Sequence, residues 1–233
     1  MAVTATTLSR SAGVAAAAAG LIFIGVQINH PATELASVTS TEWAVRNSLK
    51  VLMAALALAG IAGMYLRQVT RSGVLGLVGY LVLSAGYLMI LSTSAISAYV
   101  LPALADTDPG YVSDVLAAGT GGTVTGDIGL LAPVFQAQSF AYLAGGLIFG
   151  IALYRARVLA RWAAALLAAG GVVTVALAVM PDAFYRFLAF PNGIAMVGLG
   201  YALWRVAGTT SPPADGHAPR LMTDAGSARA GSR

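Results

Sequence analysis

The chain of 233 residues contains no cysteine. Disulfide bonds, thiolate nucleophiles, cysteine-bound zinc, iron–sulfur clusters and thioether-attached haem are therefore all excluded. Charge is also scarce, since only 9% of the residues are charged and Lys50 is the only lysine. In soluble domains about a quarter of all residues are charged. This chain has too few to cover a surface that faces water.

The chain is rich in apolar residues. Hydrophobic residues make up 58% of it, and the mean hydropathy is +0.80. They stand in long runs that reach the roughly 20 residues needed to cross a bilayer. We therefore expect an integral membrane protein. The preference for alanine, glycine and arginine is typical of a GC-rich bacterial genome, which favours a bacterial cytoplasmic membrane.

The apolar runs predict an all-α fold, a polytopic transmembrane bundle of six helices. Each run is apolar on all sides, unlike the one-sided stripe of a soluble surface helix. Residues 1–10 are expected to form a cytoplasmic N-terminus, and residues 207–233, rich in Gly, Ser, Pro and Ala, a disordered cytoplasmic tail. The predicted helices cover residues 11–29, 47–66, 73–100, 130–154, 162–180 and 188–206.

The distribution of charge predicts the orientation. With the N-terminus in the cytoplasm, the arginine clusters fall on the inner segments and the acidic residues on the outer loops, which is the positive-inside pattern. It places both termini inside and requires an even number of spans. Because the arginines lie at the ends of apolar runs and not on one patch, no nucleic-acid partner is predicted. The inner arginines are Arg10, Arg67, Arg71, Arg155, Arg157, Arg161 and Arg205.

Two alternatives stay open. Residues 1–29 could be a cleaved signal peptide, because Arg10 precedes a suitable apolar core, although no small-x-small cleavage site follows. The helices could also form three tandem hairpins, since outward helices end on a proline and inward helices on an aromatic residue near an arginine. General topology signals produce the same pattern without a repeat. The compared motifs are NHPA, VLPA and VMPD, and GMYLR, IALYR and YALWR.

The predicted spans hold no Asp, Glu or Arg well inside the bilayer. Ionised groups at that depth are costly and usually functional. Their scarcity argues against a transporter with a buried carboxylate and against a voltage sensor. One histidine outside the tail cannot supply two axial haem ligands, and no intramembrane protease motif occurs. We predict no catalytic residue, no metal site and no cofactor. Lys50 is expected within about a turn of the outer end of its helix.

Neutral polar side chains gather toward the outer ends of the predicted spans. They predict a shallow pocket of amides and hydroxyls open to the outside, although hydrogen bonds between helices explain such residues more simply. His30 precedes a proline, which disfavours helix at the residue before it. We therefore interpret His30 more as the end of a helix than as a residue that binds a ligand. The candidate pocket residues are Gln27, Asn29, His30, Ser94, Gln136, Gln138 and Asn192.

The outer loops carry local signals of their own. The stretch DPGYVSDVLAAG predicts a short helix with Asp108 as its N-cap. Thr39 and Glu42 match a capping box at the start of the second helix, which places Trp43 at the outer interface. The four aspartates of residues 101–129 lack the spacing of an EF-hand loop. No calcium site is predicted there.

Six stretches of the sequence resemble those of a known group of proteins. They are INHP, ASVTSTEWAVRNSLK, GMYLRQVTRSG, LGLVGYLV, FGIALYRARVLARWAAALLAAG and GLGYALW. Through them the chain resembles a family of small bacterial six-helix integral membrane proteins of unknown function, over about residues 11–206. The resemblance implies the six-helix membrane fold. It implies no activity, substrate or catalytic residue.

Three hypotheses for function follow. The first, which we predict, is a non-catalytic membrane protein that acts with membrane lipids, other membrane proteins or a second copy of itself, or as a sensor. The alternative is a small transporter or channel for a neutral or lipophilic solute, using the outer amide cluster. The third is an enzyme with His30 as general base, which requires Glu34, Glu42 or Asp182 within hydrogen-bond reach.

Overall fold

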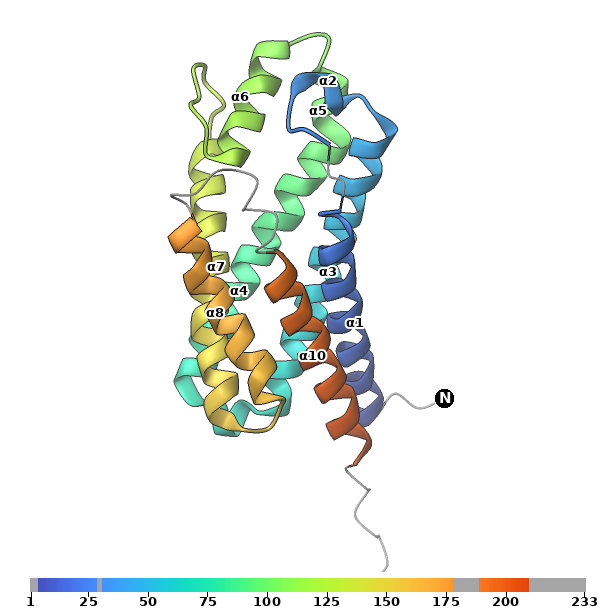
Figure 1. Ribbon diagram of the computed structural model, residues 1–233, viewed down its shortest axis with the longest axis vertical. Coiled ribbons are helices and arrows are strands. Elements are labelled where there is room, and N and C mark those ends of the chain that lie inside the picture. The colour runs from blue at the N-terminus through green and yellow to red at the C-terminus, as the bar shows by residue number, and fades with distance from the viewer. Residues whose placement is uncertain (1–3, 29–30, 178–188, 210–233) are drawn as a thin grey trace, which may run out of the picture.

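The computed structural model describes residues 4–28, 31–177 and 189–209, and these fold into helices without strands. Their six longest helices run side by side along the long axis of the molecule (Figure 1). The predicted C-terminal tail from residue 210 onward lies outside the described residues. The six helices are α1 (Ala5–Gly25), α3 (Thr41–Arg67), α4 (Val69–Ala95), α7 (Leu131–Ala156), α8 (Arg161–Leu177) and α10 (Ala189–Gly208).

These helices close a ring. In chain order, α1 packs on α3, α3 on α4, α4 on α7, α7 on α8 and α8 on α10, and α10 packs back on α1. The start of α1 and the end of α10 lie at the same end of the bundle (Figure 1). At the α1–α10 seam a Cβ added at Gly13 would lie 2.6 Å from the carbonyl oxygen of Gly200. Only glycines allow these two backbones to approach so closely.

Within the described residues, four helices are long and apolar enough to cross a membrane: Ala5–Gly25, Thr41–Arg67, Val69–Leu104 and Leu131–Ala156. They indicate a membrane protein. The described part of α8 includes a shorter apolar helix, Arg161–Val172, and α10 is not among the four. The count of six spans and the arrangement as three hairpins therefore stay predictions.

The second helix begins earlier than predicted, at Thr41 instead of residue 47. The predicted capping box is wrong by one residue, because the N-cap is Ser40, whose hydroxyl accepts a hydrogen bond from the backbone N–H of Trp43 at 3.2 Å. Thr39 instead ends a short helix, α2 (Leu35–Val38). The earlier start places Lys50 about 14 Å along α3, at 1.5 Å per residue. It lies deeper than the single turn expected.

The third predicted helix extends from Val69 to Leu104, with a kink at Gly73, whose φ of 55° is not helical and where the prediction placed the helix start. Near its end lie a π-helical turn, η1 (Ile96–Val100), and a last helical turn, α5 (Leu101–Leu104). Pro102 explains the π turn, since proline has no N–H and its ring clashes with the carbonyl four residues before it. The N–H of Leu101 bonds to the carbonyl of Ile96, five residues back.

A cap covers one end of the bundle and has its own hydrophobic core. We define the cap as α2, α5, α6 (Pro109–Thr120) and residues 121–130. Asp108 is the N-cap of α6 as predicted, and its carboxylate accepts from the N–H of Tyr111 at 3.0 Å. The buried residues of the cap core include Val38, Trp43, Leu101, Val112, Val115 and Ile128.

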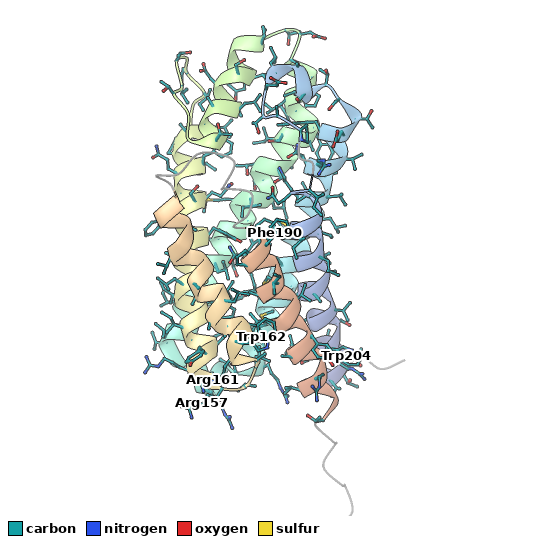
Figure 2. The ribbon with its side chains drawn as sticks, in the orientation of Figure 1. Arg157, Arg161, Trp162, Phe190 and Trp204 are labelled. Carbon is teal, nitrogen blue, oxygen red and sulfur yellow. The ribbon has the colours of Figure 1, made fainter. Side chains whose placement is uncertain are left out.

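The opposite end carries arginines and aromatic rings, and we call it the arginine end. The guanidinium of Arg10 lies 4.7 Å from the centroid of the Trp204 ring. That of Arg161 lies 4.1 Å from the centroid of Tyr154. Figure 2 shows Arg157 and Arg161 at the turn between α7 and α8, at the same end as Trp204 of α10. Arginine over an aromatic ring is a usual pairing at the headgroup level of a membrane.

Candidate functional site

A cavity of about 290 Å³ lies between the bundle and the cap. Helices α1, α3, α4, α6 and α7 and the turn η1 all contribute side chains to its wall. Of the predicted pocket residues, Gln27, Ser94 and Gln138 line it. A site built from this many separate elements depends on the fold as a whole.

The other predicted pocket residues lie elsewhere. Gln136 is exposed on α7, two residues from Gln138 but outside the cavity wall. Asn192 of α10 is buried, and its amide lies against the backbone of Gly170 on α8. It fits the simpler explanation of a polar side chain between two helices. Asn29 and His30 lie outside the described residues.

Lys50 lines the cavity, which sequence reasoning missed. Its ammonium donates a hydrogen bond to Oδ1 of Asn47 at 3.3 Å. The amide of Asn47 in turn donates to the backbone carbonyl of Trp43 at 3.0 Å. Asn47 is buried, so this small chain holds Lys50 in place from its own helix. Ser40 as the N-cap was the available signal, because a helix that begins after it places Lys50 more than two turns from the helix start.

Thr93 and Gln138 join α4 to α7 at the cavity wall. The Thr93 hydroxyl lies 2.7 Å from Oε1 of Gln138. The same hydroxyl lies 3.0 Å from the carbonyl of Met89 in its own helix, so its single proton is shared between these acceptors. Thr93 is buried and Gln138 is half-buried. The contact therefore holds the Gln138 side chain against α4.

Trp43 links the π turn to α3. Its indole Nε1 donates to the carbonyl of Ser97 at 2.8 Å, and both residues line the cavity. In a regular α-helix the Leu101 N–H would reach this carbonyl, but here it bonds to Ile96 instead. Pro102 cannot donate at all. The indole thus satisfies a carbonyl that the π turn has released, and π turns are frequent at functional sites.

The rest of the wall is apolar. Phe23, Met53, Ile90, Leu116 and Phe135 line the cavity beside the polar groups. Toward the arginine end the core of the bundle is filled, with Ile61, Met64, Phe149, Leu153 and Leu203 each at 0% exposure. The cavity is therefore amphipathic and belongs to the cap end alone.

The cap forms the roof of the cavity through α6, whose Leu116, Gly119 and Thr120 line it. On the other face of α6, the Asp114 carboxylate accepts from the backbone N–H groups of Thr125 and Gly126, both at 2.8 Å. These bonds, chiefly that from Thr125, lower the pKa of Asp114 below its usual value. The carboxylate holds residues 121–130 against the roof helix.

Arg46 supports the cavity from outside. Its guanidinium donates to the carbonyls of Val26 and Ile28, at 3.0 and 2.8 Å, and to the Glu42 carboxylate at 2.7 Å. The carbonyls at the end of a helix have no intrahelical partner, so Arg46 caps α1 by its side chain. Gln27 lies between the two bonded residues and is held at the cavity wall.

The described residues contain no group of three or more His, Asp or Glu side chains that could hold a metal ion. The enzyme hypothesis needs His30, which lies outside the described residues, as does Asp182. Of its other two acids, Glu42 pairs with Arg46 and Glu34 precedes α2 at the surface. The hypothesis thus gains no support here.

Comparison with protein families, with curated proteins and with solved structures finds no match to this chain. The resemblance to a six-helix membrane family therefore stays a prediction, and any function must be argued from the cavity itself.

Proposed function

We propose that this chain is a non-catalytic integral membrane protein that binds a small amphipathic solute in the cavity beneath its cap. The observation that carries the proposal is the cavity itself, in which polar side chains from four helices meet an apolar wall. Ligand sites are typically concave and mostly apolar, with a few placed polar groups. A volume of about 290 Å³ suits a solute the size of a substituted aromatic ring.

We further propose that all six long helices cross the membrane, with both termini on the cytoplasmic side and the cap outside. The positive-inside rule supports this orientation, because Arg67, Arg155 and Arg205 fall in the last turns of α3, α7 and α10. We place the chain in a bacterial cytoplasmic membrane and assign it to a family of six-helix membrane proteins. Lipids, other membrane proteins or a second copy are its partners.

The filled core favours binding over transport. A transporter or channel for a neutral or lipophilic solute would need a path past Ile61, Phe149 and Leu203, all fully buried. A cavity confined to the cap end suits a receptor or sensor, in which the bound solute alters the contact between the cap and the bundle. The transport function remains the second candidate.

The test uses Trp43 as a reporter. The chain has three tryptophans, so the Trp162→Phe, Trp204→Phe protein keeps only the one in the cavity wall. Titration in nanodiscs with bromophenyl solutes, para-bromophenylacetate and its carboxamide, should quench Trp43 saturably. A protein that keeps only Trp162, which is 59% exposed and lies outside the cavity, should show only non-saturable quenching from solute dissolved in the bilayer.

A matched pair of variants controls for position. Ser94 is buried at the cavity and Ser92 is exposed on the same helix. Ser94→Phe should fill the cavity and abolish the saturable quenching, while Ser92→Phe should leave it intact. Absence of saturable quenching by both solutes in the unblocked protein, or equal quenching in both serine variants, would contradict a binding cavity.

A further inference from the structure

We infer that a groove at the arginine end binds an anionic phospholipid, with the lipid phosphate beside Arg205 and an acyl chain along the seam between α8 and α10. This lipid site is separate from the cavity beneath the cap, and it does not depend on whether the cavity binds a solute. It narrows the expected lipid partners to one chemical class and one place on the molecule.

The groove lies where the end of α10 faces the turn between α7 and α8, and its volume is about 250 Å³. Val158 and Ala160 of the turn form one wall. The other wall is a single face of α10, because its residues are spaced three, four and seven positions apart. They are Ala202, Arg205, Val206 and Thr209, the last just beyond the helix end.

The α10 wall of the groove is held in place and presents one cation. The Arg67 guanidinium of α3 donates to the carbonyl of Val206 at 3.3 Å, and the Thr209 hydroxyl donates to the same carbonyl at 2.9 Å. Because the single proton of that hydroxyl is engaged, Arg205 is the described lining side chain that can donate to an anion. Its guanidinium lies 5.8 Å from the centroid of the Tyr201 ring, a pairing with the ring face that leaves N–H donors for a phosphate.

The charge at this end favours an anion. Six exposed arginines here have no carboxylate partner in the described part of the chain, whose acidic residues all lie at the cap end of the bundle. In the proposed orientation this end meets the inner leaflet, and basic pockets between membrane helices on that side bind anionic headgroups. The six are Arg10, Arg71, Arg155, Arg157, Arg161 and Arg205.

The apolar surroundings favour a lipid over a free phosphate. Apart from Arg205 and Thr209, the side chains that line the groove are apolar. One turn before Ala202, the Trp162 ring lies over α10, since a Cβ added at Gly198 would lie 2.5 Å from Cη2 of Trp162. Trp162 is 59% exposed, and Figure 2 shows it between α8 and α10. An acyl chain that leaves the groove along this seam would contact the ring.

The experiment uses Trp162 as the reporter, in the protein with Trp43→Phe and Trp204→Phe. Phosphatidylcholine nanodiscs receive a small fraction of one brominated lipid, either phosphatidylglycerol or phosphatidylcholine with the same brominated chains. Brominated phosphatidylglycerol should quench Trp162 as if its fraction beside the ring were about fivefold higher than in the bilayer. Brominated phosphatidylcholine should quench according to its fraction in the bilayer.

A matched pair of variants separates a site from general attraction to a positive surface. Arg205→Gln should remove most of the excess quenching by phosphatidylglycerol, and Arg205→Lys, which keeps the charge, should retain part of it. Arg71→Gln removes one exposed charge from the same end but outside the groove wall, so it should leave the excess intact. An unchanged thermal midpoint and unchanged Trp162 emission in phosphatidylcholine would show that each variant folds.

The possible results decide between a lipid site and its alternatives. Equal quenching by the two lipids would overturn the inference. An equal loss of the excess in Arg205→Gln and Arg71→Gln would also overturn it, because it would indicate diffuse attraction. Soluble glycerol phosphate should leave the preference in place, and displacement by it would overturn the choice of a lipid. Trp43 is absent from this reporter protein, so none of these results bears on binding beneath the cap.

Discussion

Asp114 shows how one carboxylate can hold a whole segment in place. It accepts two backbone N–H bonds and the Thr125 hydroxyl, and so fixes residues 121–130 to the roof helix. A Cβ added at Gly126 would lie 2.7 Å from Oδ2 of Asp114. A larger residue at that position would push the carboxylate away from the N–H groups that it accepts from.

The lowered pKa of Asp114 makes its stabilisation depend on pH. A group whose folded-state pKa lies below its unfolded value stabilises fully above the unfolded pKa and loses this effect as the pH falls through the folded pKa. Asp114→Asn should therefore lower the thermal midpoint at neutral pH. The difference from the parent protein should shrink below about pH 4, the ordinary range of aspartate.

Thermal unfolding in detergent, followed from pH 7 into the acid range, measures this difference. Asp106→Asn is the control, because Asp106 is an exposed carboxylate of the same cap region. A gap between Asp114→Asn and the parent protein that stays constant down to the most acid pH would rule out the proposed contribution of the carboxylate.

At the scale of the element, the π turn and Trp43 belong together. Pro102 takes away one backbone donor, the Leu101 N–H shifts to Ile96, and the indole of Trp43 reaches the carbonyl of Ser97. Helix α3 and the π turn that follows α4 are joined at this point.

We expect these residues to be energetically coupled. Trp43→Phe removes the indole donor and should cost about 1 kcal/mol, the net worth of a typical hydrogen bond. Pro102→Ala restores an N–H and allows regular α-helical bonds, after which the Ser97 carbonyl gains a backbone donor. In that background the cost of Trp43→Phe should be smaller. Unfolding free energies of the four proteins of this cycle measure the coupling. Equal costs in both backgrounds would show that Trp43 and the π turn are independent.

Long elements and their local ends were predictable from the sequence, because their signals are local. Helix α7, at Leu131–Ala156, lies within two residues of its prediction over 130–154, since an apolar run sets its length. Asp108 was recognised as a cap by the residue type and the helix that follows. The N-cap of α3 was missed by one residue because Thr39 and Ser40 are both good N-caps, and the choice between them depends on α2. The predicted start at residue 47 was late because the apolar run that was used to place it begins after the first turns of α3.

The sequence did not predict which face of each helix turns toward the interior of the bundle. These helices are apolar on all sides, so no polar stripe shows which face meets the interior. Gln136 and Gln138 are both glutamines on the same apolar helix, yet only Gln138 reaches the cavity. The π turn likewise depends on a donor from another helix, which lies 54 residues away along the chain.

At the scale of the whole molecule, the absence of cysteine becomes an experimental advantage. Single cysteines can be introduced without a native background and labelled with a membrane-impermeant maleimide. Thr107→Cys lies beside the cap, and Thr70→Cys lies at the arginine end, in the first turn of α4; both residues are exposed.

In intact cells Thr107→Cys should be labelled, because the cap is expected outside, and Thr70→Cys should be labelled only after the membrane is permeabilised. The parent protein, which has no cysteine, gives the background. The reverse pattern would invert the orientation, and labelling of both in intact cells would contradict a span between them.

The seam of Gly13 and Gly200 has a consequence for biosynthesis. Helix α1 leaves the ribosome well before α10, the partner that covers its glycine face. Insertion of the early helices and closure of the ring are thus separate events in time. Until α10 has been synthesised, the glycine face of α1 has no partner, and the nascent chain is exposed to mispairing during that interval.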